Sequence, residues 1–325
     1  MPRTSSRTSP LGLVLVLVSG VVLAAAQQDN PLAGKKLYVA PDSPAQRQAE
    51  TWRRSRPEDA TLMGRIAAQP VAKWLGGWVT NIGREVNQAV KTITASGAMP
   101  VFVAYNIPGR DCGQYSAGGA GGASAYRRWI GDFAKGLGGK SALVILEPDA
   151  LSGMDCLNPQ AQQERITLIR ESVHTLKAHG ASVYIDAGNA KWRTPREMAT
   201  RLTQAGIAEA DGFALNVSNF QATSINVAYG EQLSKLVDGK HFIVDTSRNG
   251  IPTTDPGQWC NPRGRALGVV PTTNTGHPLV DAFLWVKSPG ESDGTCEGGP
   301  QAGAWWAQYA LELSRLAATI TGVTN

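Results

Sequence analysis

Residues 141–149 read SALVILEPD, and this stretch decides the fold class. Its five central apolar residues follow one another without polar alternation, which is typical of a strand buried on both faces in a parallel sheet. Pro148 has no backbone N–H, so the strand must end before it. Glu147 and Asp149 therefore lie at the carboxyl end of a buried strand, where α/β proteins hold their reactive groups. Taken alone, the two carboxylates could equally be solvent-exposed side chains at the end of a strand, with no role in catalysis. The residues that follow the other strands decide between these two interpretations.

Similar apolar runs recur along the chain. Besides residues 142–146, the strand candidates are residues 37–40, 75–79, 100–105, 182–185, 212–217, 241–244 and 282–286. Helical patterns fill the intervals. One helix begins after the capping residue Asn158 and stops at Gly180, a capping box marks another at Thr194, and an apolar face over residues 126–137 marks a third.

Alternating strands and helices with doubly buried strands predict an α/β fold with a parallel sheet. At this length we expect a single-domain, TIM-like (β/α) barrel. An open doubly wound sheet is the alternative, but no GxGxxG motif follows a strand and no P-loop occurs. The glycine-rich residues 116–124 lie between a strand and a helix, which indicates a loop rather than an interdomain linker.

The first 26 residues have the pattern of a secretory signal peptide. A basic region with Arg3 and Arg7 precedes an apolar run over residues 11–23, and a run of small residues ends at Ala26. The apolar run is short for a membrane span. We therefore expect a secreted protein whose mature domain covers residues 27–325, with an uncleaved N-terminal anchor as the alternative.

Charge and motif content exclude several classes of partner. The net charge is +5 without a dense Lys or Arg run, so no nucleic-acid partner is expected. No Cys-x-x-Cys motif occurs, and His174 and His179 lie five residues apart rather than at helical zinc spacing. We expect no metal and no cofactor, no membrane contact after signal cleavage, and a monomer.

Four cysteines in an exported chain favour disulfides. A disulfide between Cys112 and Cys156, and another between Cys260 and Cys296, would each cross-link a loop that follows a strand. Loops of this length stabilise the fold by about 4 kcal/mol in the chain-entropy model.

Ionisable side chains follow five of the strand candidates. They are Asp111, Glu147, Asp149, Asp186, Asp245, Arg248, Lys287, Glu291 and Asp293. If the strands are parallel, these groups share one rim of the barrel. Carboxylates crowded in this way raise one another's pKa, which keeps a carboxylic acid protonated near neutral pH. Among reactions that pair such an acid with a second carboxylate and need neither metal nor nucleotide, glycoside hydrolysis is the leading candidate.

Three tryptophans, Trp74, Trp192 and Trp259, lie in or just after strand-end segments. Flat aromatic rings in such places suit stacking against the apolar faces of sugars, although ordinary packing explains any single one of them.

Together these segments resemble glycoside hydrolase family 6, a family of cellulases that includes endoglucanases and cellobiohydrolases. The matching segments are YNIPGRDC (105–112), EPD (147–149), DAG (186–188), DTSRNG (245–250) and KSPGESDG (287–294). The resemblance runs in order from about residue 37 to the end. It implies a β-glucan substrate and a distorted parallel barrel with about seven strands, so one of the eight strand candidates should lie outside it. The two disulfides of the family coincide with the cysteine pairs above.

The resemblance also implies roles for individual residues in an inverting mechanism. Asp149 matches the general acid, and Asp111 the aspartate that keeps the acid protonated and orients water. Asp293, near Arg248, matches the base, with a water relay through Asp111 as the alternative route. Tyr105 matches the tyrosine that crowds the sugar at the cleavage point, and Asp186 an aspartate that orders its neighbours. Matches to sugar-binding residues are Trp74, Trp192, Trp259, Asn219, Lys287 and Glu291.

Two positions depart from the family pattern. Asn189 stands where histidine is common, and it keeps hydrogen-bonding capacity but cannot carry a charge. Phe220 stands where tyrosine is common and lacks one hydroxyl. The first change is expected to weaken binding at one sugar position, where Asn189 remains a candidate contact.

We expect endo action on β-1,4-glucans. Chain-end cellobiohydrolases of the family carry long loops that roof the cleft, whereas only about 35 residues separate the 245–250 segment from Lys287. An exo-acting cellobiohydrolase is the first alternative. A secreted glucan-binding protein without catalysis is the second, and it is disfavoured because Asp149, Asp111 and Asp293 are all present.

Overall fold

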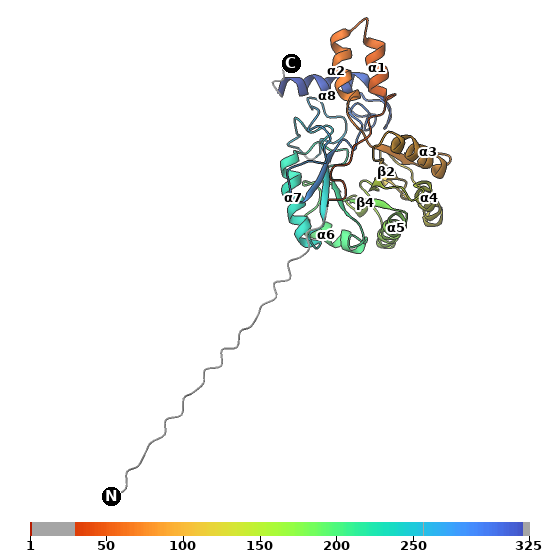
Figure 1. The fold of residues 1–325 in the computed structure, drawn as a ribbon, viewed down its shortest axis with the longest axis vertical. Helices are drawn as coiled ribbons and strands as arrows, with labels where there is room; N and C mark the ends of the chain where they lie inside the picture. Colours follow the sequence, from red (N-terminus) through yellow and green to blue (C-terminus); the bar gives the residue numbers. More distant parts are fainter. Residues whose placement is uncertain (2–29, 256, 321–325) are drawn as a thin grey trace.

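Seven parallel strands form one curled sheet in chain order, so the predicted parallel α/β barrel is confirmed (Figure 1). The computed structural model describes residue 1 and residues 30–255 and 257–320, and the predicted signal peptide lies outside these residues. The strands are β1 (Lys73–Gly76), β2 (Val101–Tyr105), β3 (Ala142–Leu146), β4 (Ala181–Asp186), β5 (Gly212–Leu215), β6 (His241–Asp245) and β7 (Val280–Leu284).

Helices surround the sheet. They are α1 (Pro44–Trp52), α2 (Pro57–Ala67), α3 (Ile82–Ala95), α4 (Ala123–Gly136), α5 (Pro159–Ala178), α6 (Pro195–Gln204), α7 (Thr223–Leu236) and α8 (Ala307–Ile320), with 3-10 turns η1 (Asp111–Gly113) and η2 (Met154–Cys156). The caps that the sequence predicted are formed. The Asn158 side chain accepts the Ala161 N–H, and Thr194 and Glu197 form a capping box. In Figure 1, α3 to α7 follow one another around the barrel, while α1, α2 and α8 gather at one end.

Three apolar clusters hold these layers together. The barrel interior is filled by inward residues such as Val103, Ile145 and Ile243, all fully buried. A larger cluster lies between the strands and α3 to α7, and a third joins α1, α2 and α8. All five residues of β3 are buried, as expected for a strand covered on both faces.

The barrel closes loosely between its two edge strands. β1 and β7 do not form a ladder, and the seam is held by a parallel bridge between Val71 and Trp285. The Ala72 N–H donates to the Trp285 carbonyl at 3.0 Å, and Trp74 Nε1 donates to the Val286 carbonyl at 2.8 Å. The seam therefore leaves β1 with an open edge toward the rim.

Four strand predictions need correction, and one of them, residues 212–217, is β5, which ends at Leu215. Residues 37–40 are not a strand, because Leu37 makes only one bridge, to Met99, before the chain turns toward α1. The candidate at 75–79 is β1, which begins two residues earlier and ends at Gly76. The candidate at 282–286 is β7, which ends at Leu284. Within the part of the chain that the structure describes, no helix combines the length and apolar character needed to cross a membrane.

Candidate active site

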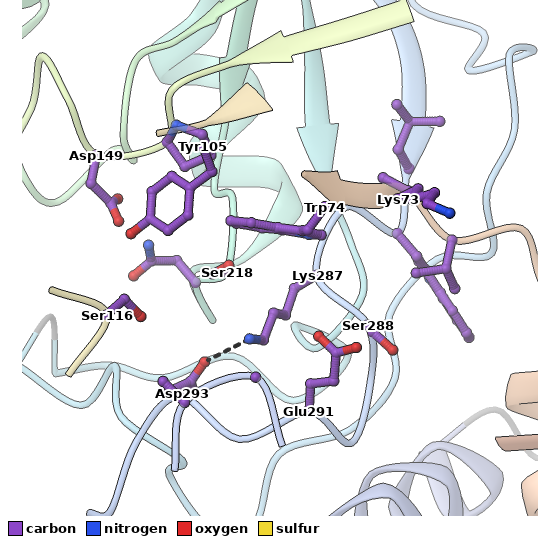
Figure 2. A pocket seen from close by; sticks show the side chains of 18 of the residues that line it. Lys73, Trp74, Tyr105, Ser116, Asp149, Ser218, Lys287, Ser288, Glu291 and Asp293 are labelled. Carbon is purple, nitrogen blue, oxygen red and sulfur yellow. Dashed lines mark ion pairs between the residues drawn. The ribbon is translucent and has the colours of Figure 1, made fainter. Parts of the chain in front are cut away.

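A cavity of about 1630 Å³ opens at the carboxyl ends of the strands (Figure 2). It brings together the predicted catalytic and sugar-contacting side chains, namely Trp74, Tyr105, Asp111, Asp149, Asn189, Trp192, Asn219, Trp259, Lys287, Glu291 and Asp293. Asp186 and Arg248, predicted as supporting residues, do not line the cavity. They lie buried behind Asp149 and Asp293, respectively, and contact them directly.

The two carboxylates that follow β3 face different surroundings. Glu147 is buried away from the cavity, where its carboxylate accepts the N–H groups of Asn106 and Ile107 and the Tyr126 hydroxyl, each at 2.9 Å. Burial raises the pKa of Glu147 to about 7, although these hydrogen bonds lower it in part. Glu147 thus ties the exit of β3 to the exit of β2, while Asp149 opens onto the cavity. Both residues have positive φ, 50° and 68°, which turns the chain sharply enough to separate them.

Asp149 has the electrostatic surroundings of a proton donor. Desolvation raises its pKa well above the usual range for an aspartate, and the charges of Asp186, Asp111 and Asp293 raise it further. The backbone N–H of Asp149 donates to Asp186 Oδ1 at 3.0 Å, which fixes the start of the turn. The site therefore favours a neutral, protonated carboxyl at Asp149.

Asp111 lies on a short loop that a disulfide anchors. Its Oδ2 accepts the Ser116 N–H at 2.6 Å, and burial raises its pKa. The neighbouring Cys112 is bonded to Cys156, and the second pair, Cys260–Cys296, is also formed, so both predicted disulfides are confirmed. Asp111 and Cys112 have positive φ values of 56° and 49°, and the loop therefore turns tightly over the rim.

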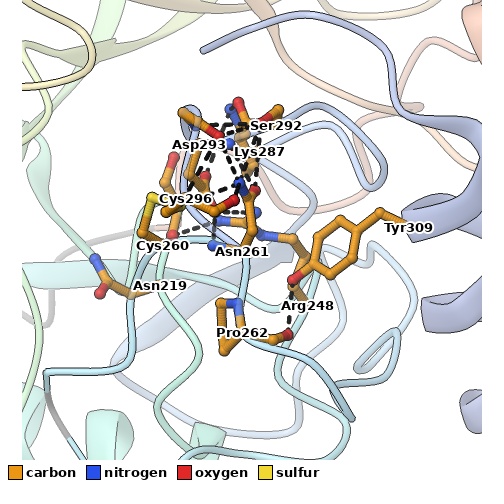
Figure 3. A network of polar contacts seen from close by, with 12 residues as sticks. Asn219, Arg248, Cys260, Asn261, Pro262, Lys287, Ser292, Asp293, Cys296 and Tyr309 are labelled. Carbon is orange, nitrogen blue, oxygen red and sulfur yellow. Dashed lines mark hydrogen bonds and ion pairs between the residues drawn. A yellow bond between two sulfur atoms is a disulfide. The ribbon is translucent and has the colours of Figure 1, made fainter. Parts of the chain in front are cut away.

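Asp293 is surrounded by cations and a backbone donor (Figure 3). Its Oδ2 accepts Arg248 Nη1 at 2.8 Å and the Asn261 N–H at 3.1 Å, and Lys287 Nζ lies 3.8 Å from Oδ1. These contacts fix the positions of both carboxylate oxygens of Asp293. Asn261 was not predicted as part of the site. The one available sequence signal was that it directly follows Cys260, whose disulfide restricts the local backbone.

Arg248 is fully buried and packs against Phe220, which stands where tyrosine is common in the family. Its guanidinium packs over the Phe220 ring at 4.2 Å and donates to the Ser218 carbonyl. Phe220 is also fully buried and does not line the cavity. Phenylalanine therefore supports the arginine through its ring face, and the missing hydroxyl does not alter the cavity wall.

Several aromatic rings line the same cavity as Asp149. Trp74 meets Tyr105 edge to face, with ring centroids 5.1 Å apart. The exposed ring of Trp192 lies against Gly153 and Gly188, close to Asn189. The Asn189 Oδ1 accepts the Lys191 N–H at 3.0 Å and so orders the turn that carries Trp192.

Trp78 and Tyr115 also line the cavity, and neither was predicted from the sequence. Trp78 is 57% exposed and packs with Arg110, whose guanidinium lies 5.3 Å from the ring centre. Tyr115, on the loop with Asp111, reaches across to Trp259, with ring centroids 6.0 Å apart. Tyr115 could have been found in the sequence, because it is an aromatic residue directly before the glycine-rich loop of residues 116–124. Among the described residues, no group of three or more His, Cys, Asp or Glu side chains is placed to hold a metal ion.

Comparison with known proteins agrees with this geometry. Residues 32–317 match the family described as glycosyl hydrolases family 6. The chain is 45% identical to Endoglucanase A of Cellulomonas fimi over 88% of its own length and 62% of that protein. It is 40% identical to Endoglucanase 1 of Streptomyces halstedii over 85% of its length and 86% of that protein.

A solved structure has the same fold. The endoglucanase Cel6 from Mycobacterium tuberculosis, in complex with methyl-cellobiosyl-4-deoxy-4-thio-β-D-cellobioside, superposes with a TM-score of 0.84 at 45% identity. The match covers 89% of this chain and 99% of that one. The distorted seven-stranded barrel is thus shared with a protein that holds an oligosaccharide.

Proposed function

Because the chain belongs to glycosyl hydrolases family 6, we propose that it is an inverting endo-β-1,4-glucanase that acts on cellulose or related β-glucans. The observation that carries this proposal is Asp149, a carboxyl with a raised pKa in a long cavity lined by tryptophans. Glycoside hydrolysis needs a protonated carboxyl beside the leaving oxygen, and the three surrounding aspartates keep the proton on Asp149.

Inversion requires water to attack from the face of the sugar opposite the acid. Asp293 lies at the opposite wall of the cavity from Asp149 in Figure 2 and is our candidate base. Its contacts with Arg248 and Lys287 hold its oxygens in fixed directions. Asp111, whose Oδ2 is bound to the Ser116 N–H, offers the alternative route through a relayed water.

Tyr105 and the tryptophans position the sugar chain. Burial and the charges of Asp149 and Asp111 raise the pKa of Tyr105 far above its usual range, so its hydroxyl stays neutral. We assign to it the crowding of the ring at the cleavage point. Trp74 and Trp192 are assigned to stacking, and Lys287, Glu291 and Asn219 to sugar hydroxyls.

Endo action is supported by the short connections around the cavity. The chain between β6 and β7, residues 246–279, is tied to the barrel by hydrogen bonds such as Gly250 N–H to the Ala266 carbonyl and Thr272 N–H to the Phe283 carbonyl. We infer that a connection held down in this way does not roof the cavity, so that an internal segment of a polymer can enter. An exo-acting cellobiohydrolase would need long loops that cover the cavity. A protein that only binds glucan would be expected to lack one of the acidic residues Asp149, Asp111 and Asp293.

A viscosity experiment tests the proposal. With a soluble β-1,4-glucan, viscosity should fall steeply while few reducing ends appear. Cellobiose as nearly the sole early product, without loss of viscosity, would instead identify an exo enzyme, and no hydrolysis at all would leave the binding-only function. The anomeric form of the first product, followed by NMR, checks inversion.

We also propose secretion, with residues 1–26 as the signal peptide. The two disulfides fit an oxidising compartment. Sequencing the amino terminus of protein collected outside the cells should give a start near Gln27, whereas an intact Met1 on membrane-bound protein would identify an anchor.

A further inference from the structure

The cavity does not end at Trp74. It continues past the open edge of β1 into a groove between α3 and the segment that leads into α1. We call this the β1–α3 groove and define it by Tyr38, Asp42, Gln69, Lys73, Gln88 and Thr92, which all line the same cavity as Asp149. In Figure 2, Lys73 lies on the far side of Trp74 from Asp149.

The groove exists because, within residues 30–255 and 257–320, no further strand pairs with the outer edge of β1. The neighbouring face of α3 carries Glu85, Gln88 and Thr92 at intervals of three and four residues, so these side chains line up along one side of the helix. The opposite wall comes from residues 37–45 and from Gln69. Residues 37–40 in that wall have the apolar pattern of a strand but form only one bridge, from Leu37 to Met99.

The chemistry of the groove suits an uncharged, hydroxyl-rich chain. Lys73 and Glu85 neutralise each other in an ion pair of 2.6 Å. Within residues 30–255 and 257–320, the side chains of Gln69, Gln88 and Thr92 form no hydrogen bond with the protein, so their donors and acceptors remain available to a ligand. Tyr38 contributes a half-buried ring that packs on the outer core. Amides, a hydroxyl and one aromatic ring are the groups that contact sugars.

The size of the whole cavity points to a polymer. At about 1630 Å³ it exceeds the range of roughly 300–1,000 Å³ that is usual for small-molecule sites. We propose that the β1–α3 groove binds further glucosyl units of the same β-glucan chain, beyond those held by Trp74. This proposal rests on the proposed function and adds a binding region that favours long chains over short ones.

Blocking the groove tests the proposal. Gln88→Trp places a bulky ring in its middle, on an exposed position of α3. Lys91→Trp is the matched control, since Lys91 is exposed on the same helix but does not line the cavity. Tyr38→Ala is a second variant that removes a contact without adding bulk. Each protein is assayed on cellotetraose and on cellohexaose labelled at its reducing end.

For Gln88→Trp we expect kcat/KM on cellohexaose to fall about five- to tenfold, the range for losing one well-formed binding contact. Cellotetraose hydrolysis should change less than twofold, and Lys91→Trp should match the parent on both substrates. The preferred cleavage position in labelled cellohexaose should also shift in Gln88→Trp and, less strongly, in Tyr38→Ala.

Equal losses on both substrates, an unchanged cleavage position, or identical behaviour of Gln88→Trp and Lys91→Trp would each overturn the proposal. These outcomes differ from failure of the proposed function, in which the parent protein hydrolyses neither oligosaccharide.

Discussion

The Asp186 carboxylate accepts the backbone N–H of Asp149 at 3.0 Å, and the same Oδ1 accepts the Gly188 N–H at 3.0 Å. Its other oxygen, Oδ2, is buried and has no hydrogen-bond partner among the described residues. Burial raises the pKa of Asp186 to about 7. A second titrating carboxyl therefore lies directly behind the candidate acid, close enough to influence both its position and its proton.

Replacement of Asp186 should shift the pH dependence of activity. Asp149 must be protonated to act, so its pKa sets the limb on which activity falls as pH rises. Negative charge on Asp186 raises that pKa. In Asp186→Asn the charge is gone while the amide oxygen can still accept the Asp149 N–H. The alkaline limb of kcat/KM should therefore move to lower pH.

Asp111→Asn is the comparison for that experiment. Asp111 also raises the pKa of Asp149, and it lies in the cavity on the Ser116 loop. It should shift the same limb and also lower the maximal rate, because the water-orienting carboxylate is lost. If Asp186→Asn lowered the melting temperature but left the alkaline limb in place, Asp186 would act only as a structural residue.

Glu147 should behave as a structural carboxylate despite its place two residues before the acid. Its oxygens accept two backbone N–H groups and the Tyr126 hydroxyl in a fully buried setting. In Glu147→Gln an NH₂ group would face these donors. We expect a loss of about 1–3 kcal/mol in the free energy of unfolding, measured with urea. Asp149→Asn is the control and should lose far less, because that side chain opens onto the cavity.

The Cys112–Cys156 disulfide should support both stability and the Asp111 loop. It closes a sequence separation of 44 residues, which corresponds to about 4 kcal/mol in the chain-entropy model. The double variant Cys112→Ser with Cys156→Ser should unfold at lower temperature and lose part of its rate, since Asp111 and Ser116 are less firmly held.

Removal of Cys260–Cys296 is the matched comparison, with a separation of 36 residues. It should lower the melting temperature to a similar extent but shift the alkaline limb of the pH profile less than loss of the first disulfide does, because the Asp111 loop stays anchored and Asp293 keeps its contacts with Arg248 and Lys287. An equal shift in both double variants would argue against a specific role of the first disulfide in holding Asp111.

Much of this architecture could be predicted from the sequence, since buried parallel strands such as residues 142–146 are recognisable by their continuous apolar runs. Residues 37–40 were wrongly predicted to be a strand because they are equally apolar for another reason, namely the packing of Leu37 and Tyr38 beside the sheet. Motifs also predicted that Asp111, Asp149 and Asp293 gather at the rim, but not that Glu147 and Asp245 are buried away from the cavity. They did not predict the contact between Asp186 and the Asp149 N–H or the continuation of the cavity along α3, because both depend on how distant segments pack.

The decisive prediction concerns Asp149 itself. Asp149→Asn removes the transferable proton and keeps the shape of the side chain. General acid catalysis contributes roughly 10²–10⁴-fold, equal to about 3–5 kcal/mol of barrier. The loss should be largest for cello-oligosaccharides, whose sugar leaving groups need protonation. A cellobioside with an activated phenolic leaving group needs it less and should lose much less activity.

Binding provides the control for this experiment. Cello-oligosaccharide affinity, measured by calorimetry, should survive in Asp149→Asn because Trp74, Trp192 and Lys287 are untouched. Asp293→Asn should show the opposite pattern, with similar losses on both substrate classes, since activation of water is needed whatever group departs. If Asp149→Asn slowed the activated and the natural substrates equally, Asp149 would not be the proton donor. The acid would then have to be sought at another carboxyl of the rim, with Asp111 the first to test because its pKa is also raised and it lines the same cavity.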